Sequence, residues 1–187
     1  MTCHRFTLIC WSILWIYWIV ASNGNKKDVY RHNSFVRAIT WAGPVLGYVL
    51  LFAPLSIGWL GTRLFHQDSA IQIVGACVCP VGAAFAIWAR HTIGTNWSGT
   101  MTLKEGHELI QAGPYGLVRH PIYAGLLLAF LGAAMALGEV RGFMAVLMAA
   151  VAFMKKMNDE ECIMNMQFPD EYPKYQARVR RLVPFIF

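Results

Sequence analysis

Residues 121–154 read PIYAGLLLAFLGAAMALGEVRGFMAVLMAAVAFM, two apolar runs separated by the short connection Gly138–Gly142. Such a short connection predicts an antiparallel helical hairpin. The first run, Pro121–Leu137, has the minimum length for a membrane-spanning helix, about 17 residues. The second, Phe143–Met154, is shorter before charge appears, so we expect its helix to continue past Lys155 and Lys156 into Glu160 and Glu161. Small residues that would allow close helix packing are Gly125, Gly132, Ala133, Ala134, Ala145, Ala149 and Ala150.

Three further apolar runs precede this hairpin, at Phe6–Ala21, Trp41–Leu60 and Ala70–Ala89. The first follows Arg5 and could be the core of a signal peptide. Its tryptophans and the poor cleavage site at Ala21–Asn23 favour a helix that is retained. With the hairpin, these runs predict an all-α, polytopic membrane bundle of about five transmembrane helices.

The composition supports the membrane class of protein. Hydrophobic residues make up 57% of the 187 residues and charged residues 14%, against about 25% charged in an average soluble domain. The same numbers exclude intrinsic disorder. The five cysteines follow neither a disulfide framework nor a zinc spacing, and we expect no metal site.

The distribution of positive charge predicts the orientation in the membrane. Of the 16 Lys and Arg residues, 13 fall in the 22–40 loop, the 90–120 loop and the C-terminal tail, which five spans place on one side. The positive-inside rule assigns that side to the cytoplasm and the N-terminus to the outside. The net charge of +6 then indicates anionic lipids as partners, and no nucleic acid.

Two polar groupings would meet at this cytoplasmic face. Arg119 and His120 come just before Pro121, at a helix start whose free N–H groups would attract a carboxylate. Glu160 and Glu161 follow the last apolar run. Each grouping also has a plainer interpretation, a juxtamembrane anchor for the first and a solvated helix end for the second. In the tail, residues 168–184 interleave aromatic and basic side chains, which indicates an interfacial lid or a lipid-facing surface rather than a site for single-stranded nucleic acid.

Residues 94–184 resemble the isoprenylcysteine carboxyl methyltransferase family, a group of integral-membrane enzymes. The first part of the pattern is Gly94-x-x-Trp97-Ser98, His107-x-Leu109-Ile110, Gly113-x-Tyr115 and Arg119-His120-Pro121-x-Tyr123-x-Gly125. The second part is Glu160-Glu161, Phe168, Tyr172, Tyr175 and Val183-Pro184.

The resemblance implies S-adenosylmethionine as cofactor and assigns the site residues. Those expected to bind the cofactor are His107, Glu108, Leu109, Ile110, Tyr115, His120, Pro121, Ile122, Tyr123 and Glu160. Those expected to be catalytic are Lys156, Glu160 and Glu161. Lys156 stands where the family usually has Arg at the methyl-acceptor side, and Lys lacks the fork that grips a carboxylate.

The resemblance also implies one domain over residues 1–187, with helices one to three in 1–90 and the cofactor-binding and catalytic half in 91–187. Relatives of this size are typical of prokaryotes, so we expect a bacterial or archaeal cytoplasmic membrane. The acceptor stays open: an isoprenylcysteine-like or other lipophilic carboxylate, an amine headgroup, or a thiol or hydroxyl from the bilayer.

Two other function classes are less consistent with the sequence than a methyltransferase. A small transport or assembly protein is disfavoured because the apolar runs contain no Asp, Glu, Lys, Arg or His. An NADPH-dependent membrane reductase of the sterol-reductase type is disfavoured by the Glu160-Glu161 tail.

Overall fold

The computed structural model describes residues 2–22, 34–54, 58–66, 70–97 and 109–184. Every regular element in these ranges is a helix. The long helices are α1 (Cys3–Ser22), α2 (Ser34–Phe52), α3 (Ala70–Ile93), α4 (Pro121–Leu137) and α5 (Val140–Gln167), followed by the short α6 (Tyr172–Arg178). Single 3₁₀ turns lie at Gly58–Gly61, Gly94–Asn96 and Gly113–Gly116. The predicted all-α class is confirmed.

The predicted hairpin is present, with the expected start and end of α4. Pro121 begins α4, where its missing N–H costs no hydrogen bond, and Gly138 ends it with φ 71° in the left-handed region. Helix α5 has 28 residues, which makes it about 42 Å long. It therefore continues well past the apolar run and carries Glu160 beyond it, as expected.

The boundaries predicted for the second apolar run, Trp41–Leu60, were wrong. Helix α2 starts earlier, at Ser34, and ends at Phe52. Pro54 explains the end, because a proline disfavours helical geometry in the residue before it.

Two of the helices, α1 and α3, are long and apolar enough to cross a membrane by length and composition alone. Within the described residues, Trp41–Phe52 and α4 are shorter apolar helices, and α5 becomes charged in its second half. The five-span topology and its orientation therefore stay predictions.

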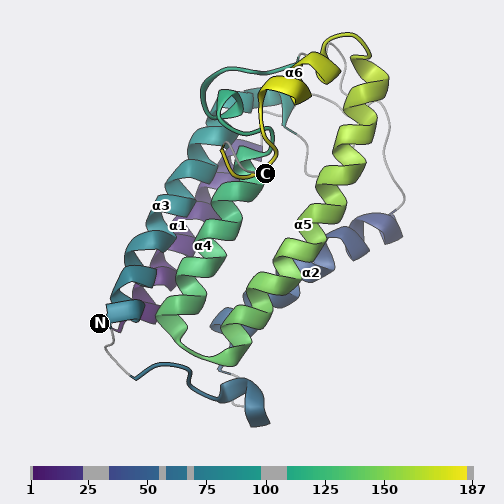
Figure 1. The fold of residues 1–187 in the computed structure, drawn as a ribbon. Helices are drawn as coiled ribbons and strands as arrows, with labels where there is room; N and C mark the ends of the chain where they lie inside the picture. Colours follow the sequence, from purple (N-terminus) through teal and green to yellow (C-terminus); the bar gives the residue numbers. More distant parts are fainter. Residues whose placement is uncertain (1, 23–33, 55–57, 67–69, 98–108, 185–187) are drawn as a thin grey trace.

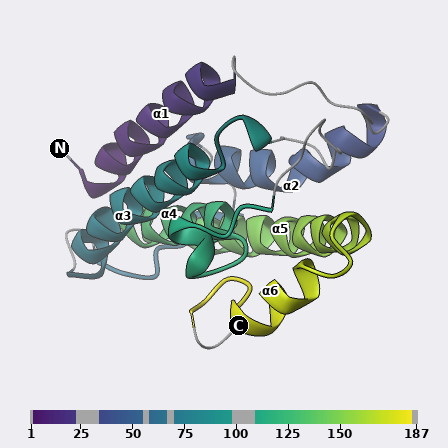
Figure 2. The same ribbon diagram turned by 90° about the horizontal axis from the view of Figure 1, so that it is seen from above.

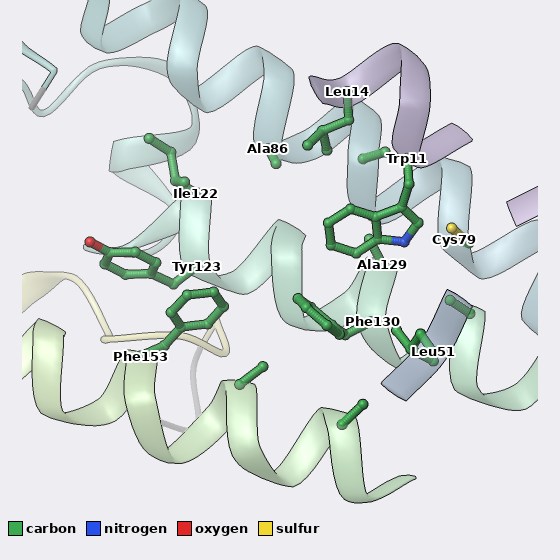
Figure 3. Close-up of a cluster of buried hydrophobic side chains, with 14 of the residues drawn as sticks. Trp11, Leu14, Leu51, Cys79, Ala86, Ile122, Tyr123, Ala129, Phe130 and Phe153 are labelled. Atoms are coloured by element: carbon green, nitrogen blue, oxygen red, sulfur yellow. The ribbon is translucent and has the colours of Figure 1, made fainter. Parts of the chain in front are cut away.

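Helix α4 is central in the bundle, as Figures 1 and 2 show, with α3 on one side and α5 on the other. Helix α1 packs on α3 and α4, and α2 packs along α5. Two ring pairs fill the middle: Trp11 lies edge-on to Phe130 at 4.7 Å between centroids, and Tyr123 stacks on Phe153 at 5.1 Å (Figure 3).

Glycines bring α3 and α4 into backbone contact. A Cβ added to Gly82 would lie 2.4 Å from the Ala129 nitrogen, and one on Gly132 would lie 2.4 Å from the Cys79 nitrogen. No real Cβ fits at such distances, so this packing requires glycine at both positions. It matches the small-residue interfaces typical of membrane helices.

At the hairpin end of the bundle, the buried Arg141 caps the C-terminal end of α2. Arg141 donates hydrogen bonds to the carbonyl oxygens of Leu50 (3.0 Å) and Ala53 (2.5 Å), and its Nε donates to Glu139 at 2.7 Å. The last carbonyls of a helix have no partner within the helix. Arg141 and Glu139 therefore form a structural clamp, which we call the hairpin cluster.

Candidate active site

A pocket lies at the other end of the bundle, where α1, α3 and α5 end and α4 begins. Its volume is about 190 Å³, more than ten times the minimum of about 15 Å³ that holds one water. One part is polar and is lined by Tyr115, Arg119, His120, Glu160, Tyr172 and Tyr175. The other part is apolar and mostly aromatic, lined by Trp15, Trp18, Trp41, Trp97, Leu126 and Phe153.

His120 lies between the two adjacent carboxylates. Its Nε2 is 3.0 Å from Glu161 Oε1, and its Nδ1 is 3.6 Å from Glu160 Oε2. Burial lowers the pKa of this imidazole, but the hydrogen bonds and charges of Glu160 and Glu161 outweigh burial and raise it above 6.5. The two carboxylates therefore favour the charged imidazolium, which forms a hydrogen bond with Glu161 through Nε2 and an ion pair with Glu160 through Nδ1.

Glu160 is the carboxylate that faces the pocket. It accepts a hydrogen bond from the Tyr123 hydroxyl, whose ring stacks on Phe153. Burial raises the pKa of Glu160, while the His120 hydrogen bond and the Lys156 and His120 charges lower it, with a net decrease. The pocket thus contains the negative charge of a half-buried carboxylate.

Glu161 has a different role. It does not line the pocket; its Oε1 accepts from Arg119 Nε at 3.1 Å and lies 3.3 Å from Arg181 Nε. Burial acts to raise the pKa of Glu161, but the hydrogen bonds and positive charges of His120 and Arg119 lower it to about 2. We call Arg119, Glu161 and Arg181 the tail cluster, because it joins α5 to the C-terminal tail.

The tail is fixed to the start of α4 by backbone contacts as well. Arg119 N–H donates to the Arg180 carbonyl at 2.7 Å, and His120 N–H donates to the Arg181 carbonyl at 3.1 Å. The Arg119 side chain donates to the Val179 carbonyl at 2.6 Å, and the Tyr175 hydroxyl donates to the Tyr115 carbonyl at 2.6 Å. The tail is therefore held against the start of α4 and contributes Tyr172 and Tyr175 to the pocket lining; its role as a lid stays a prediction.

Lys156 stands where the two parts of the pocket meet. It is only 4% exposed, with its Nζ 4.3 Å from the ring centroid of Trp41 on α2 and 5.5 Å from that of Tyr123 on α4. Burial lowers the pKa of this amine, and the Glu160 charge opposes the decrease only in part.

The structure brings most of the predicted site residues together. Those that line the pocket are Leu109, Ile110, Tyr115, His120, Pro121, Ile122, Tyr123, Lys156 and Glu160. Glu161 lies beside it in the tail cluster. His107 and Glu108 lie outside the described residues.

Sequence reasoning missed the aromatic wall that α1 and α2 provide. Trp15, Trp18 and Trp41 line the pocket, and Trp18 packs edge-on against Trp97 at 5.9 Å. The tryptophans of the first run were a signal, although they equally suit a membrane interface. On α5, the spacing of Lys156, Glu160, Ile163 and Gln167 at helical intervals could have identified the face that lines the pocket.

The residues present fit a sulfonium compound. The half-buried carboxylate of Glu160 can balance its positive charge, and aromatic faces attract cations. The helix start at Pro121 adds free backbone N–H groups near the polar part of the pocket. These residues also suit the carboxylate that S-adenosylmethionine carries.

Comparison with known proteins points to one group. The family described as phospholipid methyltransferase matches residues 70–171. The protein-S-isoprenylcysteine O-methyltransferase of Tribolium castaneum is 29% identical over 116 residues, covering 60% of this chain and 41% of the relative. A probable protein-S-isoprenylcysteine O-methyltransferase of Oryza sativa subsp. indica is 28% identical over 119 residues, covering 62% of each chain.

A solved structure agrees with these sequence matches. The eukaryotic intramembrane Ras methyltransferase, isoprenylcysteine carboxyl methyltransferase, superposes with a TM-score of 0.57 at 25% identity, covering 84% of this chain and 55% of that one. The chain thus spans less than two thirds of the length of each of these relatives. The resemblance predicted from the sequence is confirmed.

Proposed function

Since the chain belongs to the phospholipid methyltransferase family, we propose that it transfers a methyl group from S-adenosylmethionine to a lipophilic acceptor at the cytoplasmic membrane face. The observation that carries the proposal is the pocket itself, which is lined both by the half-buried Glu160 and by an aromatic wall. The two parts suit the two reactants: the polar part a charged donor, and the aromatic part an apolar acceptor.

The donor supplies an activated methyl group, so the chain mainly has to position the reactants. Glu160 holds the negative charge that favours a sulfonium, and Tyr123 and His120 fix its carboxylate through the contacts described above. Leu109, Ile110, Tyr115 and Ile122 would complete the donor site. The tail excludes water, which strengthens these charge interactions.

In this proposal, residues 91–187 form the cofactor-binding and catalytic half, and the helices of residues 1–90 supply one wall of the acceptor site. Trp15 and Trp18 of α1 support that division, because they line the apolar part. We further propose an integral protein of a bacterial or archaeal cytoplasmic membrane, with its N-terminus outside.

The test is donor binding by the purified protein in detergent, measured by calorimetry with S-adenosylmethionine, its demethylated product and NADPH. We expect binding of the first two at micromolar levels and none of NADPH. His120→Gln should weaken donor binding at least about tenfold, because the Glu160 carboxylate loses the positive charge that fixes it from 3.6 Å away. The exposed His91→Gln on α3 is the matched control.

A radiolabelled methyl-transfer assay on a lipid extract then identifies the acceptor. Absence of donor binding by the wild-type protein would overturn the proposal. Binding of NADPH alone would favour a reductase instead.

A further inference from the structure

The apolar part of the pocket ends inside the bundle, and its depth limits the size of the acceptor. This inference rests on the proposed function. The lining residues nearest the hairpin end are Leu14 on α1, Leu126 on α4 and Phe153 on α5. The residues about one turn nearer that end on the same helices do not line the pocket; they are Trp11, Phe130 and Ala149. The lining therefore stops at a common level on three helices.

Aromatic rings fill the bundle below that level. Trp11 is only 2% exposed, and its ring lies edge-on to Phe130 of α4 at 4.7 Å and to Tyr48 of α2 at 5.6 Å between centroids. Figure 3 shows the Trp11 and Phe130 rings together, farther along α4 than Tyr123. We call Trp11, Tyr48 and Phe130 the aromatic floor.

The helices that carry the aromatic floor are packed closely at the same height. A Cβ added to Gly47 of α2 would lie 3.0 Å from the Ala145 carbonyl oxygen of α5 and 3.4 Å from the Phe130 ring of α4. Ala145 and Ala149 of α5 are fully buried. Because interiors packed in this way contain little free space, a chain that reaches the floor cannot pass it while these helices stay in place.

The depth of the apolar part follows from the helix geometry. Phe153 comes seven residues before Glu160 on α5, which corresponds to about 10 Å along the helix. An extended carbon chain advances about 1.2 Å per bond, since an extended polypeptide covers about 3.6 Å with three bonds. About eight carbons therefore reach from the level of Glu160 to the floor. A chain that spans one bilayer leaflet, about 15 Å, is longer than this.

We propose that the acceptor is a small amphiphile with one apolar group of about eight carbons, enclosed between the aromatic wall and the aromatic floor, and that Trp11 and Phe130 determine this length. The reacting group of such a molecule lies at the level of Glu160, beside the donor, and its last carbon meets the floor. A lipid with leaflet-length chains does not fit inside the pocket.

The first measurement is labelled-methyl transfer by the protein in lipid nanodiscs to octyl, dodecyl and hexadecyl chains, each with a carboxylate, an amine or a thiol at one end. The chains are compared at equal mole fraction in the bilayer. Since lipid tails are as apolar as the pocket side chains, differences in rate then report fit. In whichever class is methylated, we expect the hexadecyl compound to react at least about tenfold more slowly than the octyl compound, because overfilling a packed interior is unfavourable.

Variants of the floor should move this limit in both directions. Trp11→Ala opens about one helical turn, room for about four more carbons, so the rate with dodecyl relative to octyl should rise about tenfold. Phe130→Leu should act in the same direction and serves if Trp11→Ala does not fold. Leu126→Phe raises the floor and should slow the octyl compound relative to a butyl one.

Phe143→Ala is the matched control, because it removes an aromatic ring that packs against Phe65 at the hairpin end and does not line the pocket. It should keep the chain-length order of the wild type. Rates that do not depend on chain length in the wild type, or an order unchanged by both floor variants, would mean that the chain leaves the pocket sideways and would contradict the inference.

The second measurement does not depend on turnover. Octanol with a photoreactive diazirine on its last carbon is crosslinked to the wild type, and mass spectrometry identifies the labelled residues. We expect label on Trp11, Leu14 or Phe130 that excess octanol removes. Label confined to lipid-facing side chains such as Ile16 and Val151, which are both 63% exposed, would show that the chain does not enter the apolar part.

The two proposals fail separately. If the wild type binds no S-adenosylmethionine, the proposed function is wrong. If it binds this donor and the terminal diazirine labels only lipid-facing side chains, or long chains react as fast as short ones, only the limit set by the aromatic floor is wrong.

Discussion

The two ends of the bundle each contain a largely buried group of arginine and glutamate, and they differ in their relation to the pocket described above, which is lined by Arg119 of one group and by neither Arg141 nor Glu139 of the other. In the hairpin cluster, Arg141 gives its hydrogen bonds to Glu139 and to the last carbonyls of α2. In the tail cluster, Arg119 gives its bonds to Glu161 and to the tail, while the neighbouring Glu160 faces the pocket. A buried ion pair is therefore not by itself the mark of a site.

The largest difference should come from neutralising one carboxylate at each end. Glu160→Gln leaves Lys156 and His120 without their shared counter-charge, and we expect methyl transfer to fall about 1000-fold with greatly weakened donor binding. Glu139→Gln should leave donor binding unchanged. Calorimetry and labelled-methyl transfer measure both. Similar losses in the two variants would remove the functional distinction between the ends.

Arg141→Met should affect stability and not binding. It leaves the largely buried Glu139 without its closest cation and the end of α2 without donors, so we expect a loss of about 3 kcal/mol in unfolding free energy. Denaturation in mixed detergent measures this loss. The exposed Arg63→Met is the control, because Arg63 only approaches Glu139 at 4.0 Å. A donor affinity that fell together with stability, after correction for the fraction of folded protein, would show that the hairpin cluster also contributes to binding.

These comparisons also show what the sequence could predict. The hairpin followed from Pro121, Gly138 and the apolar runs because those signals are local. Glu160 and Glu161 could not be told apart, since neighbouring positions on a helix point about 100° away from each other and only the packing decides which faces the pocket. The aromatic wall depends on how α1 and α2 lie against α4, which no local pattern encodes.

Glu161→Gln should have an intermediate effect, through the tail. Arg119 and Arg181 would lose their common partner, so the lid over the polar part would open more often. We expect about tenfold weaker donor binding and faster amide hydrogen exchange in residues 168–184. An unchanged rate of amide hydrogen exchange in the tail would show that the backbone hydrogen bonds of Arg119 and His120 are enough to keep the tail docked.

The smallest effect expected is the pH dependence of tail docking. The folded pKa of Glu161, about 2, lies below its ordinary 4.5, so its contribution is present above pH 4.5 and is lost as pH falls toward 2. The folded pKa of His120 lies above 6.5, so its contribution is full below pH 6.5 and is lost as pH rises through the folded value.

Proteolysis of the tail should therefore be slowest between about pH 4.5 and 6.5. His120→Gln should abolish the increase at alkaline pH, and Glu161→Gln the increase at acid pH. A rate that does not vary with pH in the wild type would mean that neither group is linked to docking.

The glycine contacts described for the bundle also limit how a molecule dissolved in the bilayer could travel to the pocket. Backbone meets backbone between α3 and α4, and a Cβ on Gly43 of α2 would lie 2.8 Å from Ala152 of α5, so neither boundary can part without losing its packing. Near the pocket, α1 and α2 contribute Trp15, Trp18 and Trp41, and indole side chains can rotate aside while the helices stay in place. We therefore expect lateral passage between α1 and α2, with tryptophan side chains as its movable part.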